Sequence, residues 1–385
     1  MKGLRFAILS IILNSVSCAS LLARSGLSKS FIPRANYPLK RSFSSHKSNE
    51  PKFGKAKALC SFVAVACMSN AFPEHENESI KVDGSSSTEL ENRGIRAHIG
   101  VFCIPKTEAE PSENRICNYC SCGEDSFGFN ASKDKIYLGI ADGVGGFAEL
   151  GGDPALFAQT LMKNALEASN EHHFDEDQVC RNIINEAYNE LLKDFRSKEV
   201  VPMGGSTACI ALINTNDGKI KFANVGDSGL MILRPTSDEK KDYKIIFQTK
   251  ALQYRFNCPY QLAFSPKHGE FNPTNESDTE ESFEATKSFC LRSDDIVLLA
   301  TDGVLDNLFP SDIEEIVNTV DFSTESTDNV SNLISKKISF KAREYSLDRN
   351  RNSPFAVAEL EQTGKARLGG KRDDIATVAA LIKDI

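Results

Sequence analysis

The amino-acid sequence predicts a mixed α+β sandwich rather than a doubly wound parallel sheet. Two helical segments follow one another, beginning near residues 154 and 180. Strand-like runs joined by a hairpin signal come after them, so helices and strands do not alternate as βαβα. The chain has 385 residues, of which 41% are hydrophobic and 25% charged, as is usual for soluble globular proteins. This length allows one large domain or two small ones.

The first elements of the body are a strand and two helices. Residues 136–141 form a compact apolar strand that ends in Asp142-Gly143. A helix is expected to start at Pro154, because Asp153 can cap it and proline suits its first position. The second helix has the clearest periodicity. The apolar residues at helical spacing are Phe157, Leu161 and Ala165 in the first helix, and Cys180, Ile183, Ile184, Ala187, Tyr188, Leu191 and Phe195 in the second.

The remaining elements are mainly strands. The predicted strands lie at residues 207–213, 219–225, 230–233, 296–300 and 375–382. The first two surround Asn216-Asp217-Gly218, which is a strong hairpin signal. Two helices are expected before the final strand, one capped by Ser311 and the other by Asp328. Residues 265–289 are predicted to be an exposed loop.

The charge is unevenly distributed along the chain. Residues 1–60 hold eleven Lys or Arg and one acidic residue, Glu50, so this segment carries +10. Because the whole chain carries −8, the other 325 residues carry −18. An acidic body argues against nucleic acid as a partner, since phosphate backbones require basic surfaces. It suits a site that gathers divalent cations.

Residues 1–57 are basic, rich in serine and nearly free of acidic residues, which is typical of an organelle transit peptide. One interpretation is a mitochondrial presequence with an apolar start at residues 6–13, and this is the one we favour. Another is a signal followed by a transit peptide, as in plastids behind extra membranes, with Ser17-Cys18-Ala19 as the cleavage site. The third interpretation is a disordered basic tail. Residues 58–93 are predicted to be a disordered linker, because 74–93 are rich in Glu, Asn, Ser and Gly.

Residues 94–385 are predicted to form the folded domain. No run reaches the roughly 20 apolar residues that a membrane span requires. The eleven cysteines are odd in number and irregularly spaced, so we expect reduced, mostly buried thiols rather than a disulfide framework. Nothing in the sequence requires more than a monomer.

Acidic residues next to glycines occur at several predicted strand ends. A rigid strand fixes the direction of the Asp, and the following Gly lets the backbone turn and leaves its carbonyl accessible as a ligand. Several such ends brought together would form an oxygen cage that suits Mg²⁺ or Mn²⁺. The six histidines lie away from these clusters, which argues against a His-ligated zinc centre.

The order of these clusters and the residues within them resemble those of the metal-dependent protein phosphatases of type 2C (PPM). The resemblance runs from about Ala97 to the C-terminus. Six motifs in the family's order make this resemblance specific: Gly123-Glu124-Asp125, Ala141-Asp142-Gly143-Val144-Gly145-Gly146, Gly204-Gly205-Ser206-Thr207-Ala208, Asn224-Val225-Gly226-Asp227-Ser228-Gly229, Ala300-Thr301-Asp302-Gly303-Val304-Leu305-Asp306-Asn307 and Arg372-Asp373-Asp374-Ile375. The Asp-Gly-Val-Gly-Gly wording is similar to an organellar branch found in mitochondria and plastids.

The resemblance implies a four-layer αββα sandwich of two mainly antiparallel sheets flanked by helices. It also implies a serine/threonine phosphatase that uses a metal-activated water and needs no covalent intermediate. Two Mg²⁺ or Mn²⁺ ions are expected, with a weaker third. By motif, Asp142 would bridge two ions, Glu124 and the Gly143 carbonyl would complete one site, and Asp302 and Asp373 would hold the other. Asp227 and Asp306 match positions for the third ion.

Asp125 would have a different role from these ligands, because its position in the family hydrogen-bonds the water held by the metals. Phosphorylated organelle proteins are the expected partners of the enzyme.

Two departures from the family pattern leave a second interpretation open. Val144 stands where well-studied members have a His that is a candidate general acid, and Cys120 stands where they have an Arg that grips phosphate. The leaving-group proton would then come from water or another residue. The alternative function is a catalytically weak pseudophosphatase that acts as a binding module. The intact carboxylates favour the enzyme. The roles of Cys117, Cys120 and Cys122, next to Gly123-Glu124, stay open.

Overall fold

The computed structural model describes residues 94–107, 122–198, 203–237, 242–275, 284–285 and 288–385. The predicted targeting peptide, residues 1–57, and the predicted linker, residues 58–93, lie outside these ranges. Among the described helices, none combines the length and the apolar character that a membrane crossing needs.

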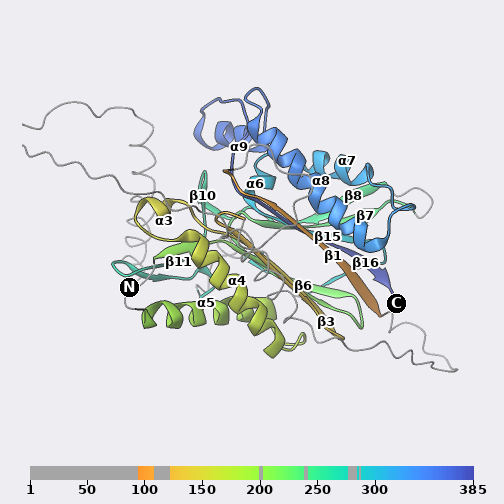
Figure 1. Ribbon diagram of the computed structural model, residues 1–385, viewed down its shortest axis with the longest axis horizontal. Coiled ribbons are helices and arrows are strands. Elements are labelled where there is room, and N and C mark those ends of the chain that lie inside the picture. The colour runs from red at the N-terminus through yellow and green to blue at the C-terminus, as the bar shows by residue number, and fades with distance from the viewer. Residues whose placement is uncertain (1–93, 108–121, 199–202, 238–241, 276–283, 286–287) are drawn as a thin grey trace, which may run out of the picture. The chain divides into compact units, whose positions relative to one another are not determined.

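Two antiparallel sheets form the centre of the fold (Figure 1). The first sheet has the order β1-β16-β15-β7-β8, and the second has the order β13-β6-β5-β3-β2, with β14 also pairing with β6. The strands of the first are β1 (Ile95–Ile104), β7 (Gly229–Pro235), β8 (Tyr243–Gln248), β15 (Ile296–Ala300) and β16 (Ile375–Asp384). Those of the second are β2 (Asp125–Ala131), β3 (Lys135–Asp142), β5 (Ala208–Asn214), β6 (Lys219–Val225), β13 (Glu284–Ala285) and β14 (Phe289–Cys290).

Helices cover the outer faces of both sheets. The helices are α3 (Gly146–Glu149), α4 (Pro154–Glu171), α5 (Val179–Ser197), α6 (Asp302–Leu305), α7 (Pro310–Asn318), α8 (Thr327–Leu347) and α9 (Pro354–Thr363). Three buried apolar clusters separate the layers: one joins α4 and α5 to the second sheet, one lies between the sheets, and one joins the first sheet to α7 and α8. The predicted four-layer αββα sandwich is therefore confirmed.

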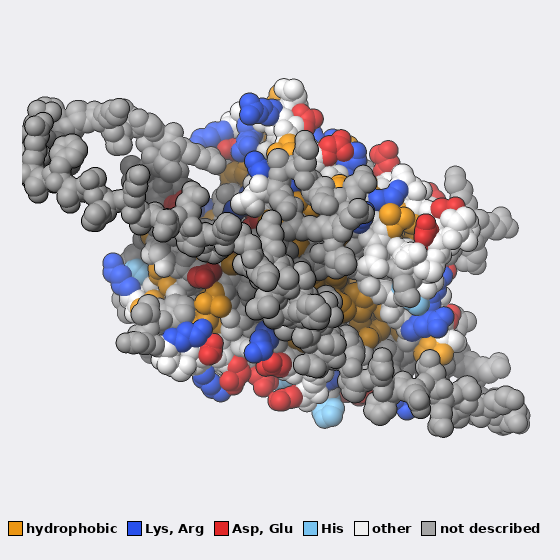
Figure 2. All heavy atoms as spheres, in the orientation of Figure 1, with side chains coloured by type: hydrophobic (Ala, Val, Ile, Leu, Met, Phe, Trp, Pro, Cys, Tyr) orange, Lys and Arg blue, Asp and Glu red, His pale blue; other side chains and the backbone are white. Residues whose placement is uncertain are grey.

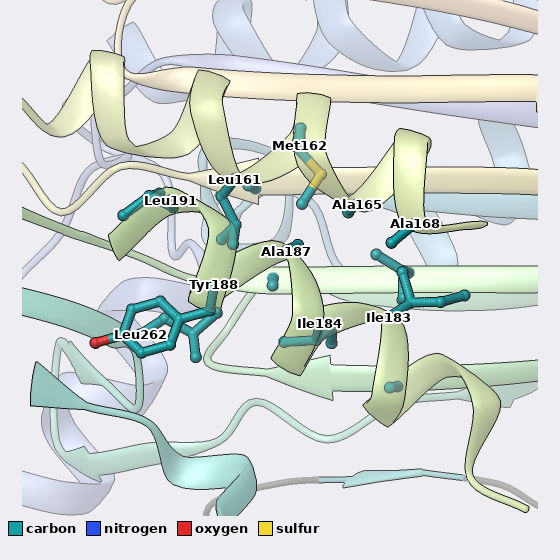
Figure 3. Close-up of a cluster of buried hydrophobic side chains, with 14 of the residues drawn as sticks. Leu161, Met162, Ala165, Ala168, Ile183, Ile184, Ala187, Tyr188, Leu191 and Leu262 are labelled. Carbon is teal, nitrogen blue, oxygen red and sulfur yellow. The ribbon is translucent and has the colours of Figure 1, made fainter. Parts of the chain in front are cut away.

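The cluster beneath α4 and α5 follows the predicted periodicity. Asp153 caps α4 by accepting a hydrogen bond from the Leu156 backbone N–H at 2.9 Å, and Pro154 occupies the first turn. Figure 3 shows Leu161, Met162 and Ala165 of α4 facing the side chains of α5. The residues of α5 that complete the cluster are Ile183, Ile184, Ala187, Tyr188 and Leu191. Both helices were thus correctly predicted from the spacing of apolar residues.

The predicted hairpin is also present, but the strand after it belongs to the other sheet. Strands β5 and β6 pair antiparallel around Gly218, whose φ of +68° suits glycine. After β6, Gly226 has φ +97°, and the chain passes to β7, which pairs with β8 and β15 in the first sheet.

Three local predictions were wrong. Helix α7 begins at Pro310, and the Asp312 carboxylate accepts from the Phe309 N–H at 2.8 Å, so Ser311 lies inside the first turn. Helix α8 is capped by Ser326, which accepts from the Asn329 N–H, and Asp328 lies within the helix. The predicted loop at 265–289 contains short strands, because backbone pairing with neighbouring segments overrides its polar composition. They include β12 (Gly269–Phe271), which pairs with β11 (Leu262–Ser265), and β11 pairs with β4 (Gly204–Ser206).

The prediction of reduced thiols was wrong for one pair. Cys103, at the end of β1, forms a disulfide with Cys122, just before β2, and their Cα atoms are 5.6 Å apart. The two strands belong to different sheets, so only the packed fold brings these cysteines together. Cys117 and Cys120 lie outside the described residues. Four cysteines of the described part are free thiols: Cys180, Cys209, Cys258 and Cys290.

Truncation of the α4 core should destabilise the domain. Leu161→Ala is expected to lower the free energy of unfolding by about 2–5 kcal/mol, because Leu161 is buried between α4, α5 and the second sheet. Leu360→Ala is the matched control, since Leu360 of α9 is 50% exposed. Urea unfolding followed by circular dichroism would measure both. Equal midpoints for the two variants would contradict this account of the core.

Candidate metal centre

Carboxylates from both sheets meet where several strands end. Asp142 is the last residue of β3, Asp227 follows β6, and Asp302 follows β15. Carboxylate oxygens of these three residues lie within 4.8 Å of one another. The sandwich therefore brings together acidic groups that are 160 residues apart in the sequence.

The surroundings of these carboxylates suit a hard cation. Asp227 Oδ1 and Asp302 Oδ1 are buried and have no hydrogen-bond partner among the described residues. Burial, followed by the negative charge of Asp302, raises the pKa of Asp142 well above its usual range and that of Asp227 to about 7. A buried, all-oxygen donor set with unpaired acceptors is the kind of site that Mg²⁺ or Mn²⁺ binds.

The Gly204–Ala208 motif fixes the position of Asp142. The Asp142 N–H donates to Thr207 Oγ1 at 2.9 Å. The Asp142 carbonyl accepts from the Thr207 N–H and from the Ser206 hydroxyl, both at 2.9 Å. Thr207 is itself held by the Ser228 hydroxyl at 2.8 Å. Both backbone polar groups of Asp142 are thus bonded, which leaves its carboxylate directed by a rigid strand end.

Asp125 lies directly opposite Asp142 in the register of β2 and β3. It is buried, and its Oδ2 accepts from the Thr301 hydroxyl at 2.8 Å. Burial and the nearby charge of Asp374 raise its pKa well above the usual range. Asp125 is therefore a carboxyl group beside the cluster whose proton is held more tightly than in water.

Glu124 stands apart from the cluster of three. Its carboxylate pairs with the Lys106 ammonium at 2.5 Å, and the pKa of Lys106 is raised although burial alone would lower it. The backbone of both residues is held by Asp374, whose carboxylate accepts from the Lys106 N–H at 2.6 Å and the Glu124 N–H at 3.0 Å. Asp374 thus connects the start of β16 to the start of β2.

Asp373 and Asp306 surround a second lysine. The Lys371 ammonium pairs with Asp302, with Asp306 at 2.8 Å and with Asp373 at 3.1 Å. Burial raises the pKa of Asp306 to about 6, although Lys371 counteracts this effect. Asp306 thus lies beside an ammonium group, whereas Asp227 groups with Asp142 and Asp302.

The two Asp-Gly pairs need glycine for a reason that sequence reasoning missed. Neither Gly143 nor Gly303 has a positive φ. A Cβ on Gly143 would lie 2.5 Å from the Pro154 carbonyl oxygen, and one on Gly303 would overlap the Asp374 carbonyl oxygen at 1.8 Å. Close approach of neighbouring backbone, not freedom to turn, therefore requires glycine at both positions.

The sequence assigned no role to four residues that organise this site: Lys106, Thr301, Lys371 and Asp374. Thr301 and Asp374 lie inside two of the motifs and Lys371 directly precedes one, so these positions were the available signal. Val144 packs against the small apolar cluster of Phe147 and Ala263, and its hydrocarbon side chain has no proton to donate. Cys120 lies outside the part of the chain that the structure describes.

Comparison with known proteins gives a consistent answer. The family model "Protein phosphatase 2C" matches residues 120–339. The chain is 34% identical over 274 residues to "Protein phosphatase 2C homolog 7, mitochondrial" of Saccharomyces cerevisiae, covering 68% of this chain and 74% of the relative. It is 30% identical over 266 residues to "Protein phosphatase PTC7 homolog" of Homo sapiens, covering 68% and 80%. The X-ray structure of the photosystem II phosphatase PBCP superposes with a TM-score of 0.56 at 23% identity, over 75% of this chain and all of that one, which supports the fold.

The fold and these relatives define a metal-dependent protein phosphatase. The chain belongs to the protein phosphatase 2C family and is a protein serine/threonine phosphatase, as the motifs predicted. The predicted pseudophosphatase alternative has no support from these comparisons.

The crowded carboxylates should make the metal-free protein less stable as pH rises. Asp306 and Asp227 have pKa values of about 6 and about 7 in the fold, above the roughly 3.9 of an unfolded chain. A raised pKa gives stability that is complete below the unfolded value and is lost as pH rises through the folded value.

We therefore expect the unfolding temperature in chelator to fall from pH 5 to pH 8, and less steeply in Asp227→Asn. Differential scanning calorimetry would measure both. A metal-free protein that gains stability over this range, with no change in the variant, would contradict the prediction.

Proposed function

We propose that this phosphatase removes phosphate from serine and threonine residues at the carboxylate cluster, using two Mg²⁺ or Mn²⁺ ions. The observation that carries the proposal is the convergence of Asp142, Asp227 and Asp302 within 4.8 Å, with two buried oxygens that lack partners among the described residues. Asp142, Asp302 and Asp373 are proposed ligands, and Glu124 and the Gly143 carbonyl complete the set. Asp227 joins this set, because its carboxylate groups with Asp142 and Asp302 rather than with Asp306.

The bound ions would lower the pKa of the attacking water and offset the charge of the phosphoryl oxygens. Asp125 would accept a hydrogen bond from that water and orient it, because strand pairing places this carboxyl opposite Asp142. The Thr301 hydroxyl occupies Asp125 Oδ2, which fixes the rotation of the carboxyl group. The Lys106 ammonium beside Glu124 would add positive charge near an incoming phosphate.

The proposed substrates are phosphorylated proteins of an organelle, and the proposed location is the mitochondrion. A basic, serine-rich segment at residues 1–57 precedes the proposed catalytic domain at 94–385. The Saccharomyces cerevisiae relative carries the word mitochondrial in its name, which supports the same location here.

We propose that the protein is a monomer. Figure 2 shows Lys and Arg side chains gathered over α9 at the top of the view, and in an acidic protein this surface favours approach of negatively charged segments.

Loss of Asp142 should abolish turnover. In Asp142→Ala, hydrolysis of a phosphothreonine peptide is expected to fall by on the order of 100-fold or more, because the ligand set loses its central carboxylate. The wild-type chain should be active with Mn²⁺ or Mg²⁺ and inactive in chelator. Asp217→Asn, in the exposed β5–β6 turn, is the matched control and should keep full activity. Wild-type activity in Asp142→Ala would refute the proposed site.

Residues 1–57 should suffice for targeting. Fused to a fluorescent protein in a cell that has both organelles, they are expected to direct it to mitochondria. The same segment with its basic residues changed to glutamine should leave the reporter in the cytosol, since presequences depend on positive charge. Accumulation in plastids would favour the signal-plus-transit interpretation instead.

A further inference from the structure

Lys371 lies among the carboxylates of the proposed metal centre. Its side chain is 17% exposed, and its ammonium contacts Oδ2 of three residues: Asp302, Asp306 and Asp373. Lys371 therefore places a positive charge inside the acidic cluster.

The backbone around Lys371 is fixed, so this placement follows from the fold. The buried Asn307 side chain accepts from the Lys371 N–H at 2.9 Å and donates to the Lys371 carbonyl at 2.8 Å. The same amide nitrogen donates to the Gly303 carbonyl at 2.9 Å. Asn307 thus ties the residue before Arg372-Asp373 to the short helix α6 that carries Asp302 and Gly303. The Phe355 ring centroid lies 5.5 Å from the ammonium.

The two oxygens of Asp302 face different partners. Oδ2 is taken by Lys371, whereas Oδ1 is buried without a hydrogen-bond partner in the described residues. Asp302 is only 7% exposed and groups with Asp142 and Asp227. One carboxylate can therefore serve two cations, the ammonium on one side and a divalent ion on the other.

Asp306, unlike Asp302, does not group with the other aspartates of the cluster. Its Oδ2 faces the ammonium, and it is not one of the three residues whose oxygens converge. A divalent ion held between Asp306 and Asp302 would meet the ammonium group of Lys371. Repulsion between like charges a few ångströms apart in a partly buried site makes joint occupancy unfavourable.

We propose that Lys371 is a resident cation that occupies the position between Asp302 and Asp306 and so limits the number of divalent ions this phosphatase binds. The ammonium also holds Asp302 through Oδ2 and leaves Oδ1 without a partner among the described residues, which makes Lys371 a positioning residue. This inference rests on the proposed function, because it presumes divalent ions at Asp142 and Asp302.

The test is to count Mn²⁺ ions on the full chain by equilibrium dialysis and elemental analysis. Lys371→Met removes the charge and keeps the length, so it is expected to gain one Mn²⁺ per chain. Lys371→Arg keeps the charge and should bind the wild-type number. Lys383→Met is the matched control: Lys383 lies in β16, pairs with Asp294 at 2.5 Å and is similarly buried, so its loss should leave the count unchanged. An unchanged count in Lys371→Met would overturn the proposal.

Asp306→Asn gives an independent test if Lys371→Met does not fold. If Asp306 pairs with the Lys371 ammonium and binds no metal ion, the Asp306→Asn variant should bind Mn²⁺ with the wild-type number and affinity. Isothermal titration calorimetry would measure both. Loss of an ion in Asp306→Asn would overturn the proposal.

Failure of the proposed function gives a different result. In that case the wild-type chain would bind no Mn²⁺, or Asp142→Ala would bind as many ions as the wild type, whatever happens at Lys371.

Discussion

Mutual repulsion among buried carboxylates is the constraint on which this structure depends. Asp125, Asp142, Asp227, Asp302 and Asp373 lie close enough that burial and neighbouring charge raise the pKa of four of them. No flexible segment could hold such a group together, because each acid would move away from the others into water. Two packed sheets with apolar cores on both faces supply the rigidity that is needed.

Polar contacts around the cluster also help to hold its residues in place. Thr207 and Ser206 hold the backbone of Asp142, Asn307 holds that of Lys371, and Asp374 holds that of Glu124. Each of these contacts is made to a backbone group and not to a carboxylate of the cluster. Lysine side chains then offset part of the charge at the two ends of the cluster. The backbone of Asp142, Glu124 and Lys371 is thus held in place by contacts that leave their own side chains free.

The sequence predicted the parts of the fold that local pattern determines. Helices α4 and α5 and the β5–β6 hairpin follow from periodicity, a cap and a turn, all within short windows. The start of α7 and the Cys103–Cys122 disulfide were missed, because backbone geometry and the meeting of two sheets decide them. At the site, the acidic motifs identified the residues that converge. They did not reveal Lys371, since a lysine next to aspartates is ordinary on a protein surface and its burial depends on α6 and Asn307.

The position of β16 has a consequence for how the enzyme is made. This strand lies between β1 and β15 in the first sheet, and Asp373 and Asp374 immediately precede it. Synthesis runs from the N-terminus, so β1 must wait for a partner that emerges almost 280 residues later. Until then the first sheet lacks the strand that joins β1 to β15, and the acidic cluster lacks Asp373, Asp374 and Lys371. A nascent chain that has not yet reached β16 therefore lacks both the strand that β1 pairs with and the complete acidic cluster.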